Sequence, residues 1–280
     1  MELSIVIPLY HSAKNTYRHL PNILTTLRNK YKAFEIIFII DNNYISKDIL
    51  PILETEKNNP EIKIYQLQKN YGQHFATLCG FYLAQGEHIL SVDEDMSHYL
   101  LELSKTDEYK KYDIYYFYYD KDMMYNSTIR RVLSNSFKKA LSFIIRVKPS
   151  STFRIITASL RDKILSRKHI FWNIDIMLIN FTDNIGGQEI DAADVTDHDS
   201  SYNYKRLFRM AFEIVYEHNT IFMNLFFALI PSILYYLRFH DRMRTTVVYI
   251  FFAILITLFF NLMKWLSPST KSKFEAAIMK

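Results

Sequence analysis

Residues 3–10 read LSIVIPLY and residues 35–43 read EIIFIIDNN. Each is a short apolar run that ends in polar or turn-forming residues, which is typical of a strand buried on both faces of a sheet. Further runs of strand length lie at Ile62–Leu67, His88–Val92 and Ile114–Tyr119, with a short one at Phe153–Thr157. Residues 20–27 and 75–82 between them have apolar side chains at helical spacing. This alternation predicts an α/β fold, with a mostly parallel sheet flanked by helices.

The charge and the N-terminal residues of the chain argue against nucleic-acid binding and against a signal peptide. The 280 residues carry 34 Lys and Arg against 29 Asp and Glu, and this mild excess of +5 comes without the basic, aromatic-rich runs of a nucleic-acid-binding protein. We therefore expect no nucleic-acid partner. The N-terminus has no basic segment before its apolar run, and Pro8 interrupts that run, so it reads as a strand and not as a signal peptide. This favours a cytoplasmic N-terminal domain.

Polar residues follow three of the predicted strands. They are Pro8–Tyr10, Asp41–Asn43 and Asp93–Asp95. Ligands of open α/β sheets bind outside the carboxyl ends of the strands, so these residues predict one site at one edge of the sheet.

The acidic cluster indicates a metal site. At the end of an apolar strand, Asp93 and Asp95 are expected on the same side of the extended backbone, and such a pair of carboxylates suits Mg²⁺ or Mn²⁺ bridging to a diphosphate. A solvated acidic turn would give the same pattern. Asp41 could accept hydrogen bonds from a nucleotide base or ribose, or it could simply end its strand.

The C-terminal region differs sharply in composition. Residues 219–237 and 245–263 contain no charge, and each window as a helix would span about 28 Å, close to the thickness of a bilayer core. Two such windows in succession favour membrane helices over buried core helices. Residues 201–218 have the spacing of an amphipathic helix, either interfacial or part of a core. We therefore divide the chain into a domain at 1–200, an amphipathic helix at 201–218, a transmembrane pair at 219–266 and a polar tail at 267–280.

Several motifs together resemble the family 2 glycosyltransferases of the GT-A fold, in the branch that acts on polyprenyl phosphates such as dolichyl and undecaprenyl phosphate. Residues 4–10 resemble the opening strand of that family, and residues 35–43 its second strand. The most specific match is residues 68–80, QKNYGQHFATLCG, followed by Ala84, Gly86 and Asp93-Glu94-Asp95. Phe153-Arg154-Ile155 and residues 200–207 resemble two later elements. The resemblance therefore covers most of the chain.

This resemblance implies a GT-A, Rossmann-like sheet followed by an interfacial helix and a membrane pair. The implied enzyme transfers a sugar, with inversion, from a UDP- or GDP-linked donor to a polyprenyl phosphate, with its catalytic domain at the cytoplasmic face of the membrane. Asp93 and Asp95 would hold Mg²⁺ or Mn²⁺, and Arg154 joins them as a catalytic candidate. The implied nucleotide-sugar site is Pro8, Tyr10, Asp41, Asn70 and Asp93, and the implied acceptor-phosphate site is Arg130, Arg131, Arg154, Ser200, Tyr202 and Lys205.

Two alternatives stay open. One is a transferase acting on a hydroxyl of another glycan or lipid-linked acceptor, which would need a general base that the sequence does not supply late in the domain. The other is a non-catalytic membrane subunit that binds a nucleotide-sugar. It would explain the departures from the family pattern at His11, Ser12, Ser97, Val195 and His198. Lipid is a further expected partner, and a homo-oligomer is open.

Overall fold

The computed structural model describes residues 1–10, 13–42, 47, 49–56, 58–118, 151–166, 174–190 and 270–278, with isolated positions between 233 and 259. The chain divides into two compact units. The first comprises residues 1–167, 174–199 and 271–280, and the second comprises 168–173 and 200–270. The elements described below form the first unit, which ends with the short helix α10 (Thr270–Ala277). In the sequence, residues 200–270 of the second unit thus lie between two parts of the first unit.

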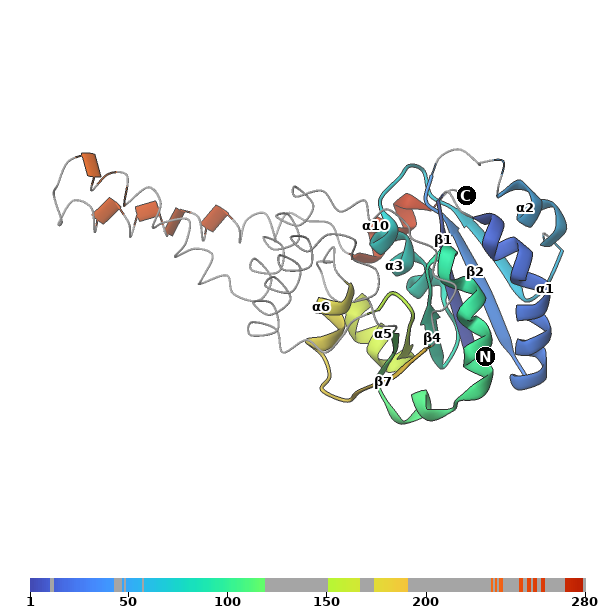
Figure 1. The fold of residues 1–280 in the computed structure, drawn as a ribbon. Coiled ribbons are helices and arrows are strands. Elements are labelled where there is room, and N and C mark those ends of the chain that lie inside the picture. The colour runs from blue at the N-terminus through green and yellow to red at the C-terminus, as the bar shows by residue number, and fades with distance from the viewer. Residues whose placement is uncertain are drawn as a thin grey trace, which may run out of the picture. The chain divides into compact units, whose positions relative to one another are not determined.

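A sheet of seven strands forms the centre of the first unit (Figure 1). Its order is β3-β2-β1-β4-β6-β5-β7. The strands are β1 (Leu3–Leu9), β2 (Phe34–Ile40), β3 (Ile62–Gln66), β4 (His88–Ser91), β5 (Ile114–Tyr118), β6 (Arg154–Thr157) and β7 (Ile185–Glu189). Strands β1 to β4 pair in parallel, β5 pairs in parallel with β7, and β6 runs antiparallel to both of its neighbours. The expectation of a mostly parallel sheet is confirmed, and the sequence did not predict β7 or the reversed direction of β6.

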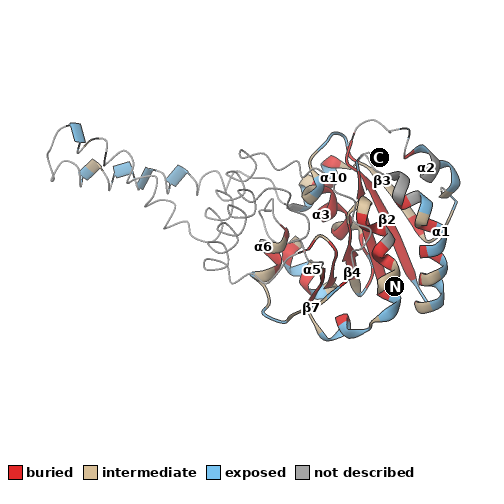
Figure 2. Ribbon diagram, in the orientation of Figure 1, coloured by how far each residue is buried: buried red, intermediate tan, exposed pale blue. Residues whose placement is uncertain are grey.

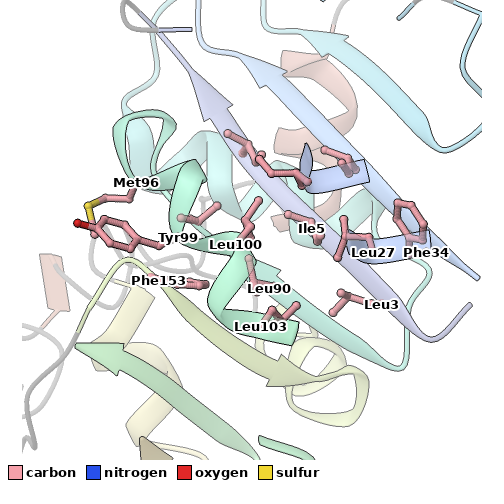
Figure 3. Close-up of a cluster of buried hydrophobic side chains, with 14 of the residues drawn as sticks. Leu3, Ile5, Leu27, Phe34, Leu90, Met96, Tyr99, Leu100, Leu103 and Phe153 are labelled. Carbon is pink, nitrogen blue, oxygen red and sulfur yellow. The ribbon is translucent and has the colours of Figure 1, made fainter. Parts of the chain in front are cut away.

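Helices cover both faces of the sheet. They are α1 (Ala13–Lys30), α2 (Leu50–Glu56), α3 (Gln73–Leu83), α5 (Ala158–Leu165) and α6 (Ile174–Ile179), with 3₁₀ segments η1 (Glu94–Lys105) and η2 (Glu108–Lys111). Figure 3 shows Met96, Tyr99, Leu100 and Leu103 of η1 in one cluster with Leu27 of α1 and the strand residues Leu3, Ile5 and Leu90. Helix α3 lies against the other face, since Gly80 contacts Val6 there.

The central strands are buried on both faces. Every residue of β1 and of β2 is buried, as Figure 2 shows. This burial explains why both runs are continuously apolar, and it requires partners for the two polar residues they contain. The carboxylate of Glu35 accepts hydrogen bonds from Ser4 Oγ (2.6 Å) and from the backbone N–H of Gln85 (2.8 Å), and Lys63 Nζ lies 2.7 Å from its other oxygen. These contacts connect β1, β2 and β3 with the turn that precedes β4.

The C-terminal windows lie almost entirely outside the described residues. So do the amphipathic segment 201–218 and the acceptor candidates Arg130, Arg131, Ser200, Tyr202 and Lys205. No helix within the described part of the chain is both long enough and apolar enough to cross a membrane.

The close contact of α3 with β1 gives a stability prediction. A Cβ added at Gly80 would lie 2.1 Å from Cγ1 of Val6, so Gly80→Ala must force the two elements apart. We expect a loss of about 1–3 kcal/mol from this overpacking, although alanine favours a helix over glycine by about 1 kcal/mol. Urea unfolding of the purified chain measures the loss.

The second half of this test is the double variant. Val6→Ala removes the methyl groups that the new Cβ would meet. The double variant, Val6→Ala with Gly80→Ala, should therefore lose less free energy of unfolding than the sum of the losses of the two single variants. Additive losses would show that the two residues are not in contact.

Candidate functional site

Asp41 lies directly after β2, at the carboxyl edge of the sheet, and is 3% exposed. Its Oδ1 accepts the backbone N–H of Tyr71 and its Oδ2 accepts that of Gly72, both at 2.8 Å. Burial raises the pKa of this carboxyl, and the two backbone hydrogen bonds partly offset the rise. Asp41 therefore fixes the loop between β3 and α3 in the structure, and contact with a nucleotide, which the sequence suggested, stays a prediction.

The loop itself is shaped by Asn70 and Gly72. Asn70 Oδ1 also accepts the backbone N–H of Gly72, at 2.9 Å, which is an Asx turn. Gly72 has φ of 93°, a region that side chains with a Cβ rarely adopt, and it immediately precedes α3. Asn70, which the resemblance placed in the nucleotide-sugar site, thus lies next to Asp41 and sets the start of α3.

Helix α3 brings its first residue to the acidic cluster. The side-chain amide of Gln73 donates a hydrogen bond to Oδ1 of Asp93. The loop that Asp41 holds is therefore connected to the predicted metal site, at the end of β4, through a single side chain. No pattern in the sequence could have indicated this contact, because Gln73 and Asp93 are distant in the chain.

Asp93 and Asp95 are placed differently from the prediction. The chain does not stay extended: Asp93 is the N-cap of η1, with φ −71° and ψ 155°, and Asp95 lies in the first turn of that helix. Their charges nevertheless interact. Burial, and next the charge of Asp95, raise the pKa of Asp93 to about 6, while Thr152, Arg154 and Gln73 oppose the rise.

This arrangement fits a divalent cation. Two repelling carboxylates are hard oxygen ligands, and a bound cation would relieve their repulsion. Within the described residues no group of three or more His, Cys, Asp or Glu side chains could hold a metal ion. A cation at Asp93 and Asp95 would therefore need further ligands, which the phosphate oxygens of a donor can provide.

Glu94 connects the acidic cluster to the end of β1. Its Oε2 accepts the backbone N–H of Tyr10 at 2.8 Å, and its carbonyl accepts the hydroxyl of Thr16 at 2.8 Å. The hydroxyl of Ser97, which is fully buried, lies 3.0 Å from that of Thr16. Ser97 was one of the departures from the family pattern, and in the structure it joins η1 to α1. Pro8 and Tyr10 thus end at the same edge of the sheet as Asp41 and Asp93.

Arg154 begins β6, directly opposite Ser91 of β4. Its guanidinium is 2% exposed, donates to Ser91 Oγ at 3.1 Å and forms an ion pair with Asp175 of α6. The hydroxyl of Tyr116 donates to the same carboxylate oxygen of Asp175, at 2.9 Å. Burial opposes the charge of Arg154, but Asp175 and the other surrounding groups leave its pKa raised.

This environment differs from the expectation that Arg154 binds the acceptor phosphate, because the guanidinium is buried and already paired. Its positive charge instead partly offsets the rise in the pKa of Asp93. The structure thus adds Asp175 to the residues near the site. No spacing in the sequence could have indicated Asp175, because α6 reaches Arg154 only through the fold.

Comparison with known proteins gives partial matches. The chain is 31% identical over 96 residues to a glycosyltransferase of Synechocystis, a match that covers 34% of this chain and 30% of that protein. It is 29% identical over 97 residues to the undecaprenyl-phosphate 4-deoxy-4-formamido-L-arabinose transferase of Salmonella choleraesuis, covering 35% of this chain and 30% of that protein. The matched region thus spans under a third of the length of these relatives.

Among solved structures, the chain resembles S. aureus TarS in complex with UDP-GlcNAc. The TM-score is 0.44 with 18% identity, over 78% of this chain and 68% of that chain. The model of the family described as glycosyl transferase family 2 matches residues 4–156, more than half of the chain. The protein therefore belongs to glycosyl transferase family 2, as its strand-end motifs indicated.

Proposed function

We propose that this chain is a membrane-anchored, inverting glycosyltransferase that moves a sugar from a nucleotide-diphosphate sugar to a polyprenyl phosphate. The observation that carries the proposal is the pair Asp93 and Asp95 at the carboxyl edge of a family 2 sheet, joined through Gln73 to the loop on Asp41. The acceptor class is supported by the motifs of residues 68–95. It is also supported by similarity to a transferase whose name specifies undecaprenyl phosphate.

In the proposed reaction, an oxygen of the acceptor phosphate attacks the anomeric carbon from the face opposite the diphosphate. The bond from that carbon to the diphosphate oxygen breaks, and the nucleoside diphosphate leaves with the electron pair. A divalent cation held by Asp93 and Asp95 would neutralise charge on the leaving group. A phosphate acceptor is already anionic near neutral pH, so positioning contributes more than a general base.

The remaining candidates have distinct roles in this proposal. The loop on Asp41, with Asn70 and the strand end at Pro8 and Tyr10, forms the nucleotide side. Arg154 opposes the rise in the pKa of Asp93, and the acceptor phosphate would be bound by the cations Arg130, Arg131 and Lys205, with Ser200 and Tyr202.

Membrane attachment is supported by exposed apolar side chains. Ile233, Leu237, Val247, Phe251 and Leu258 are between 52% and 63% exposed, and all fall within the two charge-free windows. Large apolar side chains exposed together indicate a surface that is covered by lipid or by protein.

The experiment that tests this function is a donor screen. The full chain in detergent is incubated with Mn²⁺, undecaprenyl phosphate and a panel of UDP- and GDP-sugars, and both nucleotide release and lipid-linked sugar are measured. Lipid-linked product with one donor would support the proposal. Nucleotide binding without turnover on any acceptor would favour the non-catalytic subunit instead.

Asp95→Asn should lower divalent-dependent turnover by at least about a hundredfold, because it removes a charged ligand from the diphosphate cation. The fold should be kept, since Asp95 is partly exposed at the start of η1. Initial rates over a range of Mn²⁺ concentrations measure the loss. Asp162→Asn, on an aspartate that is 66% exposed on α5, is the matched control and should keep full activity. Normal turnover by Asp95→Asn would contradict the metal assignment.

The raised pKa of Asp93 predicts a pH dependence of metal binding. Because folding raises the pKa of Asp93 from 3.8 to about 6, this group lowers the stability of the metal-free fold as pH rises from 3.8 to about 6, and below about pH 6 a proton competes with the cation. Affinity for Mn²⁺ should therefore fall about tenfold between pH 7 and pH 5. Calorimetric titration measures this change, and Asp93→Asn should bind weakly at both pH values. An unchanged affinity between pH 7 and 5 would exclude Asp93 as a ligand.

The apolar windows predict lipid binding. The wild-type chain should float with liposomes in a density gradient, and Phe251→Arg with Leu258→Arg should reduce flotation, because each charge costs about 2.5–3.5 kcal/mol within a bilayer. Lys271→Glu, on an exposed residue of α10, controls for a change of charge outside the windows. A wild-type chain that stays at the bottom of the gradient would contradict membrane attachment.

A further inference from the structure

The last described helix packs against the loop that forms one side of the site. Helix α10 follows the second apolar window and belongs to the first unit from Lys271 onward. Figure 1 shows α10 beside α3. Three kinds of contact join it to residues 67–82, and they involve apolar packing, a backbone bridge and a side-chain hydrogen bond.

The apolar contact is made by Phe274, which is fully buried. Its ring lies 5.3 Å from that of Phe75 and 5.7 Å from that of Tyr82, measured between ring centres. Phe75 in turn stacks on Tyr71 at 4.7 Å. Phe274 is thus one ring away from Tyr71, whose backbone N–H is bound by Asp41.

Polar contacts join α10 to both ends of the segment 67–82. Ala277 O accepts the backbone N–H of Gln68 at 2.9 Å, and Ile278 forms an antiparallel bridge with Leu67. At the other end, the hydroxyl of Tyr82 donates to Glu275 at 3.0 Å. Leu67 also donates its N–H to Ile40 O, next to Asp41. The loop 68–72 is therefore anchored to β2 on one side and to α10 on the other.

We infer that α10 is a positioning element for the donor side of the site, with Phe274 as its central residue. It holds the loop 68–72 and the start of α3 so that Tyr71 and Gly72 reach Asp41 and Gln73 reaches Asp93. This inference rests on the proposed function for its effect on the donor, but the contact itself can be tested without a donor. The side chains that α10 positions act in binding, so donor affinity should depend on it more than the rate of the chemical step.

The physical reason is that α10 adds apolar packing and a backbone bridge to the hydrogen bonds by which Asp41 holds the loop. Gly72 adopts a backbone conformation that costs little only in glycine, and an Asx turn alone does not fix the direction of the loop. A displacement of Gln73 would break its hydrogen bond to Asp93, and part of the donor's binding energy would then be spent on ordering the loop.

The test compares Phe274→Ala with a destabilised variant that leaves the contact intact. Leu27→Ala is suitable because Leu27 is 2% exposed and packs from α1 on the face opposite α3. Both variants remove buried apolar atoms and should lower the free energy of unfolding to a similar extent. Conditions are chosen at which both remain folded, and the full chain in detergent is used throughout.

The first measurement is amide hydrogen exchange followed by mass spectrometry. In Phe274→Ala, the amides of peptides covering residues 68–75 should exchange at least tenfold faster than in wild type, while the exchange rate of β1 should be unchanged. Leu27→Ala should leave residues 68–75 as in wild type, and Phe274→Leu should restore part of the protection because it refills the apolar contact. Unchanged exchange at 68–75 in Phe274→Ala would overturn the inference.

The second measurement is the affinity for UDP and for GDP in the presence of Mn²⁺, with donor KM and kcat once a donor is identified. Phe274→Ala should weaken binding of the preferred nucleotide about three- to tenfold and raise the donor KM by a similar factor, with kcat within about twofold. Leu27→Ala should change neither value. Faster exchange with unaltered affinity would overturn the link between α10 and the site. If the wild type bound neither nucleotide, the proposed function would fail, while the exchange result would still decide the role of α10.

Discussion

The two hydrogen bonds from Tyr71 and Gly72 to the carboxylate of Asp41 are the contacts on which the site depends. A buried carboxylate is costly unless it is paired, and a loop that contains a glycine at positive φ has little preference of its own. The buried carboxylate and the loop stabilise each other. Asp41 obtains two donors, and the loop obtains the fixed direction that brings Gln73 to Asp93.

The acidic cluster has a similar division of roles. Asp93 and Asp95 repel each other and are the proposed ligands of a cation, whereas Glu94 between them accepts the backbone N–H of Tyr10 at the end of β1. The ends of β1, β2 and β4 are thus linked by side chains that cross from one strand end to the next. In the proposed function, preorganisation of this kind would allow a diphosphate to bind without rearrangement of the sheet, so that binding energy would be available for the transfer step.

The pairing of Arg154 with Asp175 is relevant to the alternative of a transferase that acts on a hydroxyl acceptor. A transferase acting on a hydroxyl acceptor would need a general base. Asp175 is the acid that the sequence did not single out, but one of its oxygens already accepts from Arg154 and from Tyr116. These contacts suit a residue that orients Arg154. They favour the proposed phosphate acceptor, which needs no strong base. Ser97 likewise has a structural role in joining η1 to α1, so its departure from the family pattern is no evidence for a non-catalytic subunit.

The amino-acid sequence was enough to predict β1 to β6 and the acidic residues at the strand ends, because continuous apolar runs such as those of β1 and β2 are stable only when buried on both faces. It also indicated the family, since residues 68–95 keep both residue type and spacing. The contacts between distant residues followed from the fold alone. The reversed strand β6, the pairing of Arg154 with Asp175, the contact of Gln73 with Asp93 and the return of α10 to α3 all join residues far apart in the chain. Local periodicity contains no information on such contacts, because they form only once loop closure and packing have brought the elements together.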